Sequence, residues 1–294
     1  AIFWELPLLT DFLALDDHKV EDLASVLGRA TELAESWRNR CLPRLLRGIR
    51  VGLIVDDTGW RNTTAFDLGI TAMGGVCVHA PISLGGAEDV VDLAHYLDNW
   101  FDILVVRTPD LGKIRELAAA ATAPVINART RSNHPCETLG DLAFALSEGR
   151  ALDGLRVCVI APDDNILGSW AEAAAVLPIE VVQVFPTSLH SKRFANVKRF
   201  SATTDLAAMT GCDIVITDCW PKAAPASELL AYQVTRSLLD NYVPNGLFIP
   251  CPPVTRGQEV SVEALEAPQC RVIEAKAFLL HAQNALLEAI SATI

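Results

Sequence analysis

The chain has 294 residues, of which 51% are hydrophobic and 20% charged, so it contains enough apolar material for one large or two medium α/β domains. Its formal net charge of −12 argues against nucleic acid or an anionic membrane surface as a partner, because both carry many negative charges. A phosphate-bearing ligand would therefore have to be held by a local cluster of positive groups.

The eight cysteines include no CxxC pair, and several stand inside apolar runs such as the one around Cys158. Cysteines in that setting behave as small buried hydrophobes and suit a reducing compartment without a zinc site. The segment AIFWELPLL is too short and too acidic for a signal peptide, and no apolar run reaches the length of a membrane span. We therefore expect a cytoplasmic protein with no membrane partner and no metal.

Strand-like and helix-like segments alternate along the chain after one amphipathic helix at residues 17–40. In the first half we expect strands at 50–55, 76–79, 102–107 and 124–127, and helices at 63–73, 88–99 and 111–121. In the second half we expect strands at 155–161, 180–185, 213–217 and 246–250, and helices at 136–148, 168–176, 202–210 and 276–292. Such alternation predicts parallel sheets with right-handed crossovers.

The pattern predicts two doubly wound parallel-sheet lobes with a cleft between them. The first lobe comprises residues 1–135, the second comprises residues 150–275, and a helix at 136–149 bridges them. The C-terminal helix, within 276–294, is apolar enough to pack back on the first lobe. Ligands of such sheets bind beyond the carboxyl ends of the strands, so the polar residues that follow each strand are the candidates for a site.

The stretch from Ile49 to Asp67 contains an apolar strand, a polar turn and the start of a helix. The N–H groups and the positive dipole at a helix N-terminus favour an anion, and Arg61 stands at the start of this helix. The alternative, an ordinary strand-to-helix turn with one exposed arginine, is not excluded by this stretch alone.

Polar residues at the other strand ends differ between the two halves. The first-half strands are followed by Arg61, Arg107 and His134, and the second-half strands by Asp163, Asp164, Asn165 and Asp218. A basic half and an acidic half suit an anionic substrate that reacts with a cationic one. Structural alternatives exist, because Arg107 could pair with a surface carboxylate, His134 could cap the next helix and Asp218 could be an N-cap. The chain lacks GxGxxG, Walker, GxSxG and HExxH motifs, so no nucleotide cofactor is expected.

Several motifs, taken in order, resemble those of the aspartate/ornithine carbamoyltransferase family, closest to its ornithine branch, over nearly the whole chain. The most specific is His134-Pro135-Cys136-Glu137 with Leu139, Asp141 and Leu142, which is similar to HPCQ-x-L-x-D-L. The others are Asp218-Cys219-Trp220 (D-x-W), Cys251-Pro252-Pro253 with Arg256 to Val260 (HCLP and RG-x-EV), and His281-Ala282-Gln283 with Ala285-Leu286 (HAQ-x-AL).

The resemblance implies a transferase that moves a carbamoyl group from carbamoyl phosphate to the amino group of an ornithine-like amino acid or related amine. It also implies a homotrimer and no cofactor. The first lobe would bind the donor and the second the amino acid. The residues implied as catalytic are Arg107, His134, Cys251 and Arg256. Those implied to bind the donor are Gly59, Trp60, Arg61, Asn62 and Glu137, and those implied to bind the amino acid are Asn165, Ser169 and Asp218.

Several positions depart from the family pattern. The STRTR turn reads Gly59-Trp60-Arg61-Asn62-Thr63, which keeps the arginine but replaces the serine and both threonines. The glutamine of HPCQ is Glu137, which cannot donate a hydrogen bond when ionised. The SMG that follows D-x-W is Pro221-Lys222-Ala223, and the histidine of HCLP is Pro250. Two alternatives therefore stay open, a homologue repurposed for another group transfer or condensation and a catalytically silent binding protein.

Overall fold

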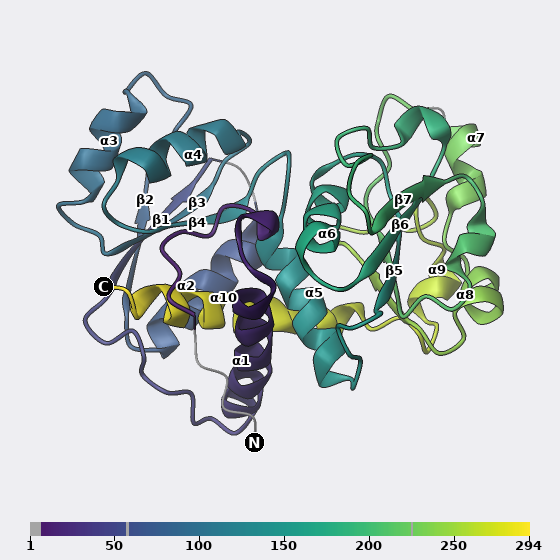
Figure 1. Cartoon of the computed structure of the whole chain (residues 1–294), viewed down its shortest axis with the longest axis horizontal. Coiled ribbons are helices and arrows are strands. Elements are labelled where there is room, and N and C mark those ends of the chain that lie inside the picture. The colour runs from purple at the N-terminus through teal and green to yellow at the C-terminus, as the bar shows by residue number, and fades with distance from the viewer. Residues whose placement is uncertain (1–6, 57–58, 225) are drawn as a thin grey trace. The chain divides into compact units, whose positions relative to one another are not determined.

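The computed structural model describes residues 7–56, 59–224 and 226–294, so Asp57 and Thr58 of the predicted anion-binding turn lie outside the described residues (Figure 1). The chain folds into two compact units. Unit 1 comprises Ala1–Phe144 and Ala277–Ile294, and unit 2 comprises Ala145–Lys276. Among the described residues, no helix is both long and apolar enough to cross a membrane.

Unit 1 is built on a four-stranded parallel sheet in the order β2-β1-β3-β4. The strands are β1 (Arg50–Val55), β2 (Val76–Ala80), β3 (Ile103–Arg107) and β4 (Val125–Arg129). The two central strands read as nearly continuous apolar runs because helices cover both faces of the sheet. The edge strand β2 is largely exposed.

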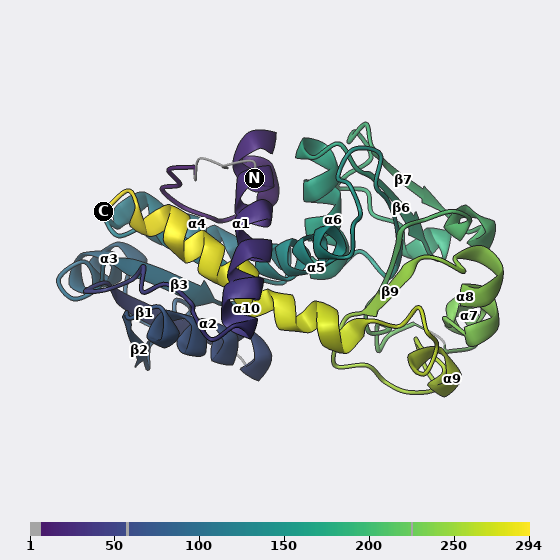
Figure 2. The ribbon, with the colours of Figure 1, turned by 90° about the horizontal axis from the view of Figure 1, so that it is seen from below.

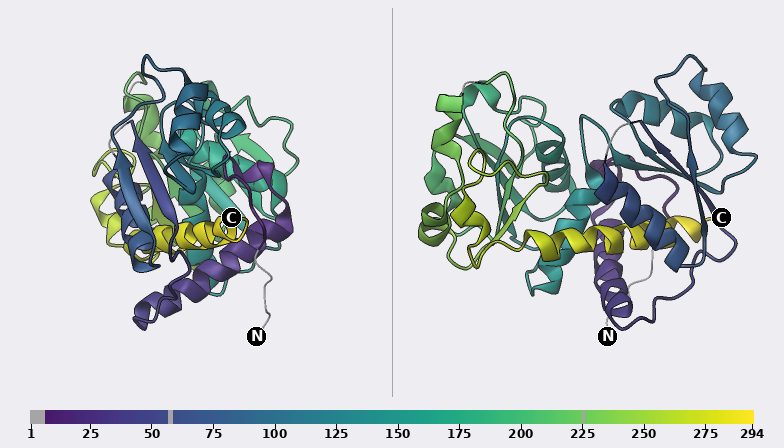
Figure 3. Two further views of the ribbon diagram at one scale, coloured as in Figure 1. Left: turned by 90° about the vertical axis from the view of Figure 1, so that its left-hand side faces the viewer. Right: turned by 180° about the vertical axis from the view of Figure 1, so that it is seen from behind.

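Helices pack on both faces of this sheet. The helices of unit 1 are α1 (Val20–Arg38), α2 (Trp60–Ala72), α3 (Val90–Leu97), α4 (Leu111–Ala120) and the unit 1 parts of α5 (Pro135–Ser147) and α10 (Val272–Ser291), with a short 3-10 turn η1 (Leu15–Asp17) before α1. Helices α3 and α4 lie on one face and α2 on the other (Figures 1 and 3). This is the arrangement that right-handed crossovers produce when the strand order turns back past β1.

The C-terminal helix α10 packs on unit 1, as the sequence predicts. It lies beside α2, where the side chain of Asn284 meets the backbone of Gly69 (Figure 3). It also crosses α1, where Arg29 Nε donates to Glu288 Oε2 at 2.7 Å (Figure 2). Residues from both ends of the chain therefore build one core.

Unit 2 contains a five-stranded parallel sheet in the order β7-β6-β5-β8-β9. The strands are β5 (Arg156–Ile160), β6 (Glu180–Val184), β7 (Phe200–Thr203), β8 (Ile214–Thr217) and β9 (Leu247–Pro250). The other elements are α6 (Asn165–Val176), α7 (Ala226–Leu229), α8 (Arg236–Tyr242) and α9 (Val262–Leu265), with 3-10 turns η2 (Thr187–Leu189), η3 (Leu206–Met209) and η4 (Leu230–Tyr232). A buried cluster joins Phe248 and Val215 of the sheet to Leu239 of α8 and Ala264 of α9.

The predicted fold class, two parallel-sheet α/β lobes, is confirmed. The helix predicted at 202–210 is wrong, because this segment holds the end of the edge strand β7 and then only the 3-10 turn η3. Asp205 caps η3, since its side chain accepts from Ala207 N. The apolar spacing of Leu206 and Met209 fits one short turn as well as a helix, so the pattern alone could not separate the two.

Candidate functional site

Each sheet has one point at which the strand order reverses. In unit 1 it lies between β1 and β3, and in unit 2 it lies between β5 and β8. The connections that leave two such strands go to opposite faces of the sheet, which leaves room for a ligand beyond their carboxyl ends. The predicted site residues Arg107, at the end of β3, and Gly59 to Asn62, Asn165 and Asp218, after β1, β5 and β8, stand at the carboxyl ends of these strands.

In unit 1, helix α2 begins at the end of β1 with Gly59 as its N-cap. Thr63 N donates to Gly59 O at 3.1 Å, which closes the first turn. A helix leaves its first N–H groups without an intrahelical partner, and Gly59 has no side chain that could cap them. This N-terminus therefore offers backbone donors and a positive dipole to an anion.

The guanidinium of Arg107 lies directly against Gly59. A Cβ atom on Gly59 would stand 2.2 Å from Arg107 Cζ and 2.3 Å from Nε, which no side chain permits. Arg107 ends β3, next to β1 in the sheet, and it is only 7% exposed. The absence of a side chain at Gly59 thus lets a buried arginine approach the start of α2.

Trp60 and Arg61 begin α2 and project outward. The indole of Trp60 is 67% exposed, and Arg61 Cζ lies 4.9 Å from the ring centroid, a cation–π distance. The ring thus stacks with Arg61 at the surface. Asn62 is 3% exposed, and its Nδ2 donates to Ala128 O of β4 at 3.2 Å, so its amide nitrogen binds the protein's own backbone.

A buried amide network supports the loop that carries His134. Asn133 Oδ1 accepts from Asn127 Nδ2 and from Thr130 Oγ1, both at 2.8 Å, and Asn133 Nδ2 donates to Leu13 O at 3.1 Å. Neither Asn127 nor Asn133 is among the site residues predicted from the sequence. Asn127 is a polar residue in the apolar run VINA, which is a signal of a buried hydrogen-bonding role, whereas Asn133 lies in a polar loop and gives no such signal.

His134 and Glu137 lie together at the start of α5. His134 Nε2 is 3.9 Å from Glu137 Oε2, and both side chains are about nine-tenths buried. The neighbouring thiol of Cys136 is fully buried and 3.5 Å from Asn127 O, and burial raises its pKa well above the usual range. Cys136 is thus a structural residue, because a nucleophilic thiol needs a low pKa.

In unit 2, the turn after β5 leads into α6. Asp164 is the N-cap of α6, and its Oδ1 accepts from Asn165 N at 2.7 Å. Asn165 is 4% exposed, and Ser169, one turn further on the same face, is fully buried. Asp163 pairs with Arg193 at 2.6 Å, so its charge is balanced on the protein.

The ends of β8 and β9 are held together by Cys251 N, which donates to Thr217 O at 2.9 Å. Asp218 Oδ1 accepts from Cys219 N at 2.8 Å, and Cys219 Sγ lies 3.1 Å from Pro253 O. Burial raises the pKa of Cys219 to about 11, and the carboxylates of three acidic residues, Asp218, Glu259 and Asp164, add to the effect. The carboxyl edge of this sheet is therefore acidic. Arg256, by contrast, is exposed on the loop after β9.

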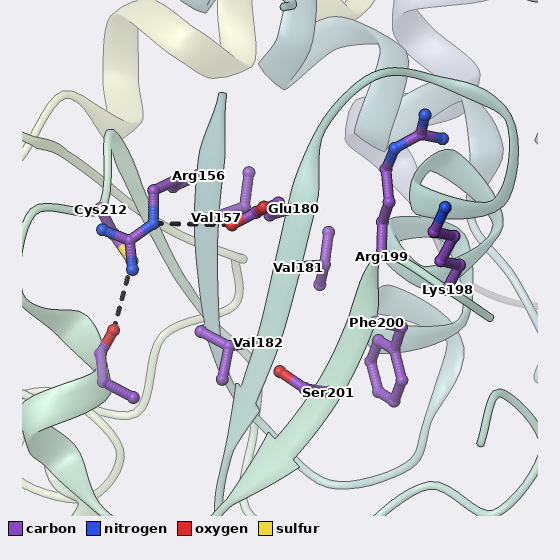
Figure 4. A pocket seen from close by; sticks show the side chains of 11 residues that line it. Arg156, Val157, Glu180, Val181, Val182, Lys198, Arg199, Phe200, Ser201 and Cys212 are labelled. Carbon is purple, nitrogen blue, oxygen red and sulfur yellow. Dashed lines mark hydrogen bonds and ion pairs between the residues drawn. The ribbon is translucent and has the colours of Figure 1, made fainter. Parts of the chain in front are cut away.

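A cavity of about 550 Å³ in unit 2 lies elsewhere, at the amino ends of β5, β6 and β7 (Figure 4). Arg156, Glu180, Lys198 and Arg199 line it together with apolar residues. None of the predicted site residues lines this cavity, and it lies at the edge opposite to the one where parallel sheets bind ligands.

Comparison with known proteins finds relatives over nearly the whole chain. The family model for "Aspartate/ornithine carbamoyltransferase, carbamoyl-P binding domain" matches residues 10–146, and the model for "Aspartate/ornithine carbamoyltransferase, Asp/Orn binding domain" matches residues 153–290. Ornithine carbamoyltransferase of Bradyrhizobium diazoefficiens is 30% identical in an alignment of 292 residues that covers 94% of this chain and 95% of that one.

Solved structures agree as well. Ornithine carbamoyltransferase from Pyrococcus furiosus superposes with a TM-score of 0.92 at 25% identity, covering 99% of this chain and 100% of that chain. The enzyme from Burkholderia thailandensis gives a TM-score of 0.90 at 26% identity, covering 97% of this chain and 99% of that chain. The fold is that of a carbamoyltransferase-like transferase. The chain belongs to the aspartate/ornithine carbamoyltransferase family.

Proposed function

We propose that this enzyme transfers a carbamoyl group from carbamoyl phosphate to the amino group of an ornithine-like amino acid. The observation that carries the proposal is the contact of the Arg107 guanidinium with Gly59 at the N-terminus of α2. It joins a buried cation to a row of backbone donors where the strand order of unit 1 reverses. Carbamoyl phosphate needs both the cation and the backbone donors, because it carries an anionic phosphate and a carbonyl group that becomes an oxyanion during the reaction.

We assign the binding site for carbamoyl phosphate, the carbamoyl donor, to unit 1. Arg61 and the first N–H groups of α2 hold the phosphate, while Arg107 and His134 polarise the carbamoyl carbonyl. Loss of one donor to a developing oxyanion typically costs ~10²–10³ in rate. Glu137 suits the other end of the carbamoyl group, because a carboxylate accepts hydrogen bonds from an NH₂. The outward position of Trp60 supports an open anion site, since the indole stacks with Arg61 at the surface.

The acceptor is assigned to unit 2. Asn165, Ser169 and Asp218 bind the α-amino and carboxylate groups of the amino acid, and Cys251 contacts the attacking amine. The carboxylates around Cys219 support a cationic acceptor, because they give this edge a negative potential. Arg256 is assigned to the donor phosphate on the family resemblance. The same resemblance supports a homotrimer, which light scattering tests by a mass three times that of the 31.8 kDa chain.

The reaction needs no strong protein base. The neutral amine nitrogen forms a bond to the carbonyl carbon, and the bond from that carbon to the phosphate oxygen breaks. The amine proton leaves on the phosphate, so the products are an N-carbamoyl amine and inorganic phosphate. Most of the rate comes from holding the two substrates in line, for which effective molarities reach ~10⁵–10⁸ M in well-oriented systems.

Calorimetry tests the donor assignment directly. The full chain is titrated with carbamoyl phosphate and, in parallel, with inorganic phosphate. Arg107→Ala should remove the micromolar binding of carbamoyl phosphate. Arg115→Ala is the matched control, because Arg115 is an exposed arginine of unit 1 that pairs with Asp17 on the surface, and it should bind as the native chain does.

The result decides between a carbamoyltransferase and the alternatives that the sequence leaves open. Micromolar binding of carbamoyl phosphate that Arg107→Ala removes supports the proposal, and a screen of amines for ureido products then identifies the acceptor. No binding at millimolar carbamoyl phosphate contradicts it and favours a homologue that uses another donor.

A further inference from the structure

Three residues that could bind a metal ion meet on the exposed edge of unit 1, apart from the site described above. Cys77 and His79 lie two residues apart on β2, so their side chains point to the same face of the strand. Asp67 comes from α2, which packs against that strand. One ligand atom from each residue lies within 4.8 Å of the other two.

We propose that Asp67, Cys77 and His79 form a binding site for a transition-metal ion of the Zn²⁺ class. A thiolate, an imidazole and a carboxylate are the three ligand types that Zn²⁺ takes in proteins, and this mixture disfavours Mg²⁺ and Ca²⁺, which prefer oxygen alone. Three protein ligands leave the fourth tetrahedral position to water or another small ligand.

The distances fit such a site with little movement. Tetrahedral Zn²⁺ at ordinary bond lengths places neighbouring ligand atoms about 3.3–3.6 Å apart. His79 Nε2 and Asp67 Oδ2 are already 3.2 Å apart. No pair of the three ligand atoms is separated by more than 4.8 Å, so closure needs a shift of roughly 1 Å.

The site is accessible and is separate from the proposed chemistry. The side chains of His79 and Asp67 are 57% and 49% exposed, so an ion can enter from solvent and both side chains can change their rotamers. Asp67 lies two turns along α2 from Trp60, about 10 Å at the rise of an α-helix. A bound ion would tie the edge strand β2 to α2 without contacting Arg61 or Arg107.

Cobalt binding tests the proposal, because tetrahedral Co²⁺ absorbs in the visible region and a Co²⁺–thiolate bond adds a near-ultraviolet band. The metal-free full chain should bind one Co²⁺ with both signals, and Zn²⁺ should displace it. Cys77→Ser should lose the thiolate band, and His79→Gln or Asp67→Asn should bind at least about tenfold more weakly. Cys41→Ser is the matched control, because Cys41 is the exposed cysteine outside the cluster, and it should keep both signals.

Measurement of the thiolate band can also contradict the proposed metal site. If the native chain shows no thiolate band, or if Cys77→Ser keeps it, the three residues do not bind the ion together. His79→Gln separates loss of the metal ligand from misfolding. The His79 side chain is largely exposed, so its replacement should leave the circular dichroism of the metal-free protein unchanged. As an independent readout, Zn²⁺ but not Mg²⁺ should raise the thermal unfolding midpoint of the native chain and not that of His79→Gln.

Discussion

Replacing Gly59 by alanine should displace the Arg107 guanidinium and lower kcat/KM. The added Cβ would lie 2.2 Å from Arg107 Cζ, whereas carbon atoms in contact are about 3.5 Å apart or more. The guanidinium must therefore move by roughly 1.3 Å, and a misplacement of about 1 Å costs ~10² in rate. That factor corresponds to about 2.7 kcal/mol of transition-state stabilisation.

The backbone should tolerate this substitution, so the effect reports on Arg107. Gly59 has a φ of −175°, which is extended backbone that any residue adopts. The free energy of unfolding should fall by less than about 1 kcal/mol, because replacing a good N-cap by alanine typically costs ~1 kcal/mol and replacing it by glycine already costs a few tenths. Urea unfolding checks this before kinetics are interpreted.

The assay is ureido-product formation with carbamoyl phosphate varied, carried out as a double-mutant cycle. Gly59→Ala should reduce kcat/KM about 100-fold in the native background. It should have almost no effect in the Arg107→Ala background, because the group that it displaces is already gone. Equal losses in both backgrounds would refute the reasoning, and so would full activity of the Gly59→Ala enzyme.

Two further predictions concern stability. A Cβ on Gly69 would lie 2.1 Å from Asn284 Oδ1, so Gly69→Ala should force α2 away from α10 and lower the free energy of urea unfolding by roughly 1–3 kcal/mol; an unchanged midpoint would contradict this packing. Burial, with a smaller effect of Arg38, lowers the pKa of His281 to about 4 from 6.5. The unfolded chain therefore takes up this proton first as the pH falls, and up to about 3 kcal/mol of stability should be lost between pH 6.5 and 4. His281→Gln should flatten the pH profile over that window, and an equally steep profile would assign the loss to other groups.

Local patterns in the sequence predicted most of the fold because they report burial directly. A strand buried on both faces must be apolar throughout, so β1, β3 and β5 were found nearly at their observed bounds. The edge strand β7 was missed, because the four residues from Phe200 to Thr203 have one buried side chain and no such pattern. A short edge strand is defined mainly by the neighbour to which it hydrogen-bonds.

The sequence by itself determined the alternation of strands and helices, the residues at the strand ends and the ordered motifs of the family. Only the tertiary structure decided what those residues touch. Asn62 stands in the predicted phosphate-binding turn, yet its amide donates to β4. The contact between Gly59 and Arg107 and the meeting of Asp67 with Cys77 and His79 join different elements. Spacing along the chain carries no such information, because it specifies which face a side chain shares within one element and leaves the facing element to packing.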